Sequence, residues 1–191
     1  MASTVDICNK ALGWLGSDRI TSLDDPSVGA KLCKDNYAGL RDAVLEESDW
    51  SFAIKRVVLA PSAILPTFGY GNKMLLPADC LRVITCSDSA NLDDENDLQW
   101  ETEDGHVMCD VNILYVKYVS SVTDESKFSP TFVEALASRI AADLAIPLSK
   151  SRELMSDMWA LYGRKVKASS SSNGMQGKNK RIKSDSFIKC R

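Results

Sequence analysis

Histidine is almost absent from this chain, and His106 is its only representative. A nucleophilic triad would have to use it, yet no G-x-S-x-G element or cysteine-nucleophile signature lies near it. One histidine and cysteines without a C-x-x-C pair also disfavour a zinc site. We therefore expect His106 to be an ordinary strand residue, and we expect a protein that is not an enzyme and needs no cofactor or metal.

Long apolar runs are missing as well. The longest run is a few residues, against the ~20 needed to cross a bilayer, so we expect no membrane association. The first residues lack a basic stretch followed by an apolar one, so we expect no secretion signal. Without export, the cysteines are expected to be reduced and mostly in the core; they are Cys8, Cys33, Cys80, Cys86, Cys109 and Cys190.

Two short segments only superficially suggest ligand binding. The acidic run at 93–97 lacks the alternating ligands, central glycine and terminal glutamate of an EF-hand, which favours a solvated loop. Gly177-Lys178 lacks the preceding glycine and the following hydroxyl residue of a phosphate-binding loop. Neither segment predicts a cofactor.

Charge is unevenly distributed. From Ser169 onward there are six basic residues and one acidic residue, whereas the preceding part has 17 basic and 25 acidic residues. The cluster at 178–183, which includes Lys180, Arg181 and Lys183, leaves three possibilities open: a solvated tail, docking on an acidic neighbouring subunit, or contact with DNA phosphates. The cluster has no aromatic residue for base stacking.

Periodicity predicts an α+β fold. Ser3 or Thr4 can cap a first helix, whose apolar residues recur at helical spacing as far as Gly16, and a second helix is expected from Asp25-Pro26 to about residue 47. Further helices are expected at 129–147 and from 149 to 168. The middle has strand-like alternation from Phe52 and a hairpin signal at Asp104-Gly105. We thus predict a helical bundle formed by 1–50 and 123–168, with a small antiparallel β region inserted at 51–122.

The predicted final part, 169–191, is a flexible arm. Its first residues, from Ser169 to Gly174, have the composition of a linker. Phe187 and Ile188 near its end are large apolar side chains that could pin the arm onto another subunit. Trp50, at the boundary between helix and strand, is expected to be a core residue.

A spaced pattern extends over most of the chain. The first stretch contains Asp49-Trp50-Ser51-Phe52-Ala53 and later Leu76-Pro77-x-Asp79-Cys80-Leu81-Arg82, and the second is Pro130–Leu148. The last seven residues end with an acid, a bulky residue and a final Arg191. Together these stretches resemble the tail tubular protein A family of tailed phages, the adaptor or gatekeeper ring of short-tailed viruses.

The resemblance implies a structural protein of the virion, assembled in the host cytoplasm. It implies a ring of twelve copies at the head–tail junction, with the bundle toward the portal protein and the β region toward the next tail (nozzle) protein. DNA would pass through the channel without sequence-specific binding, and the arm, with Lys180, Arg181, Lys183, Phe187, Ile188 and Arg191, would contact the portal. Another neck or tail-completion protein, or a small nucleic-acid-binding packaging protein, are the alternatives.

Overall fold

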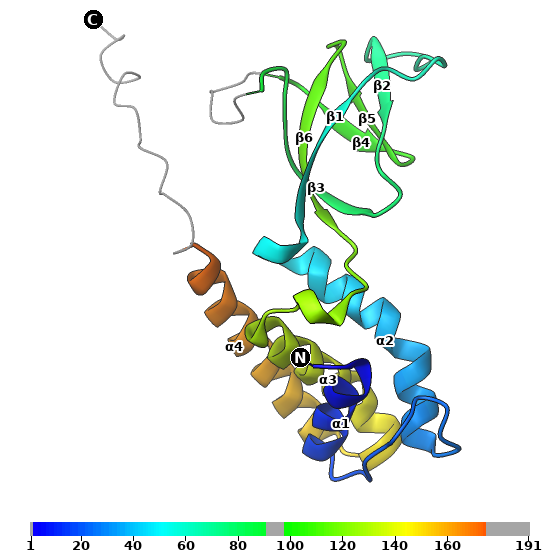
Figure 1. Cartoon of the computed structure of the whole chain (residues 1–191), viewed down its shortest axis with the longest axis vertical. Coiled ribbons are helices and arrows are strands. Elements are labelled where there is room, and N and C mark those ends of the chain that lie inside the picture. The colour runs from blue at the N-terminus through cyan, green and yellow to red at the C-terminus, as the bar shows by residue number, and fades with distance from the viewer. Residues whose placement is uncertain (1, 91–97, 175–191) are drawn as a thin grey trace, which may run out of the picture.

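The structure is a computed structural model that describes residues 2–90 and 98–174. It is an elongated molecule with a helical bundle at one end and a β region at the other (Figure 1). The bundle is built from both halves of the sequence, and the β region is inserted between them. The predicted α+β fold, with two helices before the β region and two after it, is confirmed.

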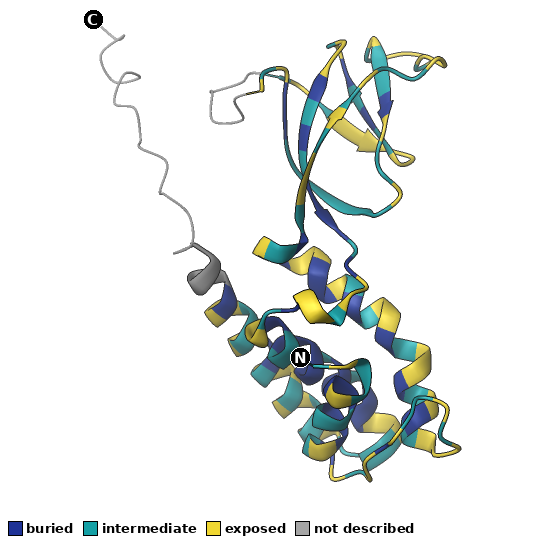
Figure 2. Cartoon of the chain, viewed as in Figure 1, coloured by how far each residue is buried: buried dark blue, intermediate teal, exposed yellow. Residues whose placement is uncertain are grey.

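Four helices form the bundle: α1 (Thr4–Trp14), α2 (Val28–Glu47), α3 (Pro130–Ser149) and α4 (Arg152–Gly174). The third is central and packs against the other three. Its buried face includes Phe132, Leu136, Ile140 and Leu144, the stripe at spacing four that the sequence presents. Buried residues accordingly concentrate around α3 (Figure 2).

Serine side chains begin the first three helices. Ser3 and Asp6 form a reciprocal capping box on α1, and the hydroxyl groups of Ser27 and Ser129 accept the backbone N–H of the third helical residue of α2 and α3. Helix α2 thus starts two residues later than Pro26, where we expected it. Asp25 instead accepts the N–H groups of Thr21 and Ser22, which closes the preceding turn.

The prediction that α3 ends at Pro147 is wrong. The helix contains Pro147 and ends at Ser149, and the cap residue that follows, Lys150, has a left-handed φ of 55°. Proline lacks the N–H group that would donate within the helix, which costs free energy. The packing of the buried face, which extends to Ala145, stabilises the helix up to the turn that contains Pro147. The Ser149 hydroxyl also donates to the Ala145 carbonyl oxygen at 2.6 Å, which supports this last turn.

The predicted linker at 169–174 is likewise helical, because α4 runs to Gly174. Ser169 is buried, and its hydroxyl donates to the Val166 carbonyl oxygen at 2.7 Å. A serine hydroxyl can satisfy a helix carbonyl in this way, so a serine-rich composition does not by itself end a helix. The rest of the predicted arm, 175–191, lies outside the described residues.

The β region has two three-stranded antiparallel sheets, where we expected a single sheet. One has the order β1 (Ile54–Leu59), β6 (Leu114–Ser120), β3 (Cys80–Ser87). The other has the order β2 (Asn72–Leu75), β5 (His106–Cys109), β4 (Glu101–Glu103). The two sheets share a small core of their own that includes Met74, Val107, Leu114 and Val116.

For two local features of this region, one prediction is confirmed and the other is wrong. Asp104 (φ 46°) and Gly105 (φ 69°) form the tight turn between β4 and β5, so the hairpin prediction is confirmed. Residues Ser51–Ala53, where we expected the first strand to begin, instead form a 3₁₀ turn, in which the Ala53 N–H donates to the Trp50 carbonyl oxygen at 2.8 Å.

Four cysteines, Cys8, Cys33, Cys86 and Cys109, are buried and Cys80 is half-buried, all as free thiols; Cys190 lies outside the described residues. Within residues 2–90 and 98–174, no helix is both long and apolar enough to span a membrane.

Candidate interaction surfaces

The bundle and the β region meet at an aromatic cluster. Trp50 is 1% exposed, and its indole N–H donates to the Val44 carbonyl oxygen at 2.8 Å. Its ring centroid lies 5.0 Å from that of Phe132 on α3, in an edge-to-face arrangement, and the Phe52 ring lies 5.2 Å from the same phenylalanine. Phe128 completes the cluster at 4.7 Å from Phe132. We call this junction the joint.

An ion pair lies within the β region, between residues close in sequence to the joint. The Lys55 ammonium contacts the Asp79 carboxylate at 2.6 Å, and the Tyr118 hydroxyl donates to the same carboxylate at 3.2 Å. The hydrogen bond from Lys55 lowers the pKa of Asp79. Burial, followed by the charge of Asp79, raises the pKa of Tyr118 to about 12.

Further polar contacts bind strand ends to the bundle. The Arg82 guanidinium of β3 donates to the Glu46 carbonyl oxygen at 2.9 Å and pairs with the Asp49 carboxylate, both at the end of α2. Just after β6, the Ser121 hydroxyl donates to the Asp42 carboxylate of α2 at 2.9 Å. The joint is therefore held by apolar packing inside and by one ion pair and several hydrogen bonds between strand ends and α2.

The structure brings most of the predicted junction residues together. Trp50 and Phe52 lie in the aromatic cluster, and Asp79 forms the ion pair with Lys55. Pro77 precedes Asp79, and its carbonyl oxygen accepts the Cys80 N–H at 2.9 Å in the turn that leads into β3. Leu76 is set apart, because it packs against the core of the β region.

A second surface lies on the β region and was not predicted. The segment 61–71 between β1 and β2 exposes Ile64 (72%), Leu65 (61%) and Phe68 (89%). Together with β4 and β5 these side chains line a hollow of about 400 Å³. We call it the tip hollow. A signal was present, since the run Ala63-Ile64-Leu65-Pro66-Thr67-Phe68 is apolar within a segment that proline and glycine mark as a loop.

The rim of the tip hollow carries negative charge. Glu101 and Glu103 are exposed on β4, one of the two edge strands of its sheet (Figure 2). Lys73 is the basic residue among the lining side chains. Desolvation, followed by the charge of Glu101, raises the pKa of Tyr70.

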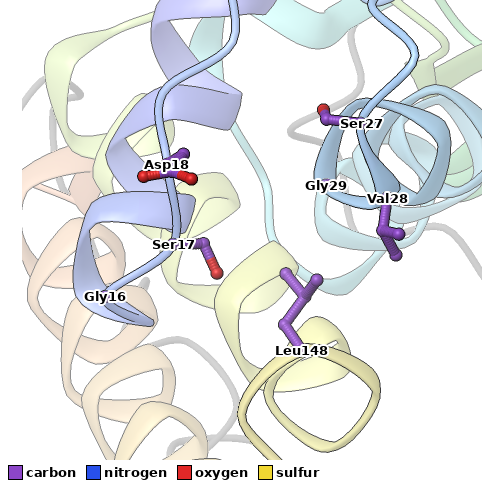
Figure 3. A pocket seen from close by; sticks show the side chains of 7 residues that line it. All are labelled: Gly16, Ser17, Asp18, Ser27, Val28, Gly29 and Leu148. Carbon is purple, nitrogen blue, oxygen red and sulfur yellow. The ribbon is translucent and has the colours of Figure 1, made fainter.

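A smaller hollow, of about 280 Å³, lies at the far end of the bundle. It is lined by the α1–α2 connection, the start of α2 and Leu148 of α3, with Ser17 and Leu148 pointing into it (Figure 3). Asp18 is its one charged lining residue. Two hydroxyl groups and a single carboxylate do not make a catalytic or metal-binding arrangement.

His106 is half-buried on β5, as expected of an ordinary strand residue, with its Nδ1 2.7 Å from the Asp104 carbonyl oxygen. Among the described residues no group of three or more histidine, cysteine or acidic side chains could hold a metal ion. The acidic run 93–97 and the predicted arm residues, Lys180, Arg181, Lys183, Phe187, Ile188 and Arg191, lie outside the described residues.

The fold and these surfaces define an α+β protein with a helical bundle, an inserted pair of small sheets and two separate hollows. No family model matches the chain, and no curated protein matches it.

Proposed function

We propose that this protein is a head-to-tail adaptor of a tailed phage, one subunit of a ring of twelve that joins the portal to the tail in the virion. The observation that carries the proposal is the place of the family-like residues. Asp49, Trp50, Phe52 and Arg82 contribute to the joint, and the carbonyl oxygen of Asp79 accepts the N–H of Ser121, whose hydroxyl group contacts α2, although these residues come from separate stretches of sequence. A pattern that specifies one junction in space supports a resemblance in architecture.

The arrangement of surfaces also favours an adaptor. The bundle and the tip hollow lie at opposite ends of an elongated molecule (Figure 1), so two partners could bind without competing. In the proposed complex the bundle faces the portal and the β region faces the next tail protein. The arm residues, with Phe187 and Ile188 as apolar contacts, add a second attachment to the portal. Tethering makes two modest contacts act as one strong contact.

Charge is consistent with passage of DNA. The part of the chain before Ser169 has 25 acidic and 17 basic residues, and like charge disfavours adhesion of a polyanion to the channel wall. In this proposal the protein has no turnover and no cofactor, and it assembles in the host cytoplasm.

Co-sedimentation with the cognate portal ring tests the proposal. We expect saturable binding of the full chain and an added collar under the portal in negative-stain images. Deletion of Phe187–Arg191 is expected to spare folding and weaken binding. Val58→Ala, which removes an exposed apolar side chain of the β region outside the tip hollow, is the matched control and should leave portal binding unchanged.

Absence of binding, with both components folded, would reject the adaptor assignment. The chain would then be another neck protein or a nucleic-acid-binding packaging protein. The latter is favoured by the basic cluster at 178–183. Salt-dependent retention on DNA that disappears when these lysines and Arg181 are neutralised would identify it.

A further inference from the structure

The tip hollow is open and has the features of a site for an apolar side chain. Ile64, Leu65 and Phe68 are each more than 60% exposed, and Met108 of β5 forms part of the hollow's lining. These large side chains leave apolar surface in contact with water. A partner that covered them would remove this surface from water, which favours binding. Its volume, about 400 Å³, is in the range of sites that accept small ligands or side chains.

The charge around the hollow restricts its occupant. Glu101 and Glu103 lie on the exposed edge strand β4. Asp110 lies close to the segment 61–71, where its carboxylate accepts the Gly71 N–H at 2.7 Å. Against these three carboxylates the lining contains one ammonium group, from Lys73. The complementary occupant has one or two bulky apolar side chains flanked by positive charges.

The end of the chain has this chemistry. In the sequence Lys183-Ser-Asp-Ser-Phe187-Ile188-Lys189-Cys-Arg191, two adjacent apolar residues are flanked by three basic residues and one acid. Phe187 is 13 residues beyond Gly174, the last residue of α4, so the intervening chain can span up to about 45 Å. Helix α4 ends on the side of the bundle that is nearer to the β region (Figure 1).

We propose that the segment 183–191 docks into the tip hollow of its own chain, with Phe187 and Ile188 against the apolar side chains and the basic residues beside Glu101 and Glu103. The same chain is the favoured source because a covalent tether that can span the separation supplies the segment at an effective concentration in the millimolar range. This site goes beyond the proposed function and does not rest on it, since it concerns the isolated chain. In the proposed ring the same segment would leave the tip hollow to contact the portal.

Cross-linking of the isolated full chain tests the site. A Thr67→Cys substitution places a thiol on the exposed rim of the hollow, and the native Cys190 lies three residues from Phe187. With a short bis-maleimide reagent in dilute solution, we expect a cross-linked monomer that forms on the order of tenfold faster than in the matched Lys31→Cys control. Lys31 is also exposed and belongs to the first turn of α2, which begins at the end of the bundle away from the β region (Figure 1).

Two further variants separate the apolar and ionic contributions. Phe187→Ala with Ile188→Ala is expected to reduce the rate to that of the control. Glu103→Lys should slow cross-linking, and adding Lys189→Glu should restore it, because the reversed pair again has opposite charges. Circular dichroism confirms that each variant is folded.

Three results would overturn the proposal. Equal rates at the Thr67→Cys and Lys31→Cys positions would mean that the segment samples the surface without docking. A cross-linked dimer as the main product would assign the hollow to the segment of a second copy. A rate that is insensitive to Phe187→Ala with Ile188→Ala would show that another part of the chain is responsible.

Discussion

At the scale of single residues, the joint depends on a few side chains that each make several contacts. Trp50 fills the space between the end of α2 and the aromatic residues Phe52 and Phe132, and its N–H has a backbone partner. Asp79 accepts hydrogen bonds from Lys55 and Tyr118, which come from two different strands. Substitutions at these positions therefore test packing and electrostatics separately.

Trp50→Ala is expected to lower the free energy of unfolding by about 3–5 kcal/mol, because it empties a buried site and leaves the Val44 carbonyl oxygen without its donor. Chemical denaturation followed by far-UV circular dichroism measures the change. Phe68→Ala, at an 89% exposed position, is the control and should change stability by less than about 0.5 kcal/mol. Similar effects for the two variants would contradict the burial of Trp50.

Asp79→Asn is expected to lower stability at neutral pH by about 1 kcal/mol, since the side chain is a partly exposed ion-pair partner. The pKa of Asp79 is lowered in the folded state, chiefly by Lys55. Its contribution is therefore full above the usual aspartate pKa of ~3.9 and is lost as pH falls through the lower, folded-state pKa.

Denaturation of wild type and Asp79→Asn from pH 7 to pH 2 checks this sign. The two curves should converge in acid. Lys55→Met removes the same ion pair from its other side, so it should flatten the pH dependence in the same way. A difference between wild type and Asp79→Asn that persists unchanged to pH 2 would exclude the ionised carboxylate as the cause.

At the scale of elements, backbone conformation decides where helices and hairpins stop. The β4–β5 turn places Gly105 at φ 69°, which a side chain disfavours. Gly39, by contrast, is an exposed residue within α2, and a Cβ atom added there would meet nothing within 4 Å. The same substitution should therefore have opposite effects at the two glycines.

Gly105→Ala is expected to destabilise the protein by about 1–2 kcal/mol because alanine is strained in the left-handed region. Gly39→Ala should stabilise it by roughly 0.5–1 kcal/mol through the higher helix propensity of alanine. Thermal unfolding of both variants measures the difference. Changes of the same sign would mean that these glycines are selected for something other than backbone conformation.

At the scale of the whole molecule, two cores are connected through the joint. The larger core fills the bundle, and the smaller one lies between the two sheets. Val119 of β6 belongs to the bundle core, whereas Val116 and Tyr118 of the same strand belong to the sheet core. Because one strand contributes to both cores, we expect them to unfold together.

Met74→Ala tests this coupling. Met74 is fully buried in the smaller core, far from the helices, and its truncation should cost about 2–5 kcal/mol. The helical signal at 222 nm should then melt at a lower temperature, although no helical residue is changed. A helical transition that stays in place while Trp100, which packs against the smaller core, reports earlier unfolding would show that the cores are independent.

Local patterns were sufficient for much of the fold. The capping serine before α1, the stripe from Phe132 to Leu144 and the Asp104-Gly105 turn act within a few residues, so their structural result could be predicted from neighbours in the sequence. The extension of α4 to Gly174 could not be predicted in this way, because a serine-rich composition favours a linker.

The division of the β region into two sheets was also decided beyond the local sequence. Strands β1 and β3 are separated by 20 residues and lie on either side of β6 in one sheet. Which strands pair therefore depends on contacts between distant parts of the chain, such as those that bury Met74 and Leu114 in the core between the two sheets. The joint is a similar case: Asp49 and Arg82 become neighbours only when α2 and β3 are in place.

By itself, the sequence determined the fold class, the number and order of the helices and the position of one hairpin, because caps, periodicity and turn residues act over short separations. Only the tertiary structure decided that Trp50 and Arg82 belong to one joint and that Ile64, Leu65 and Phe68 remain exposed over an acidic edge. Burial and exposure depend on residues far away in the chain, and no local pattern contains that information.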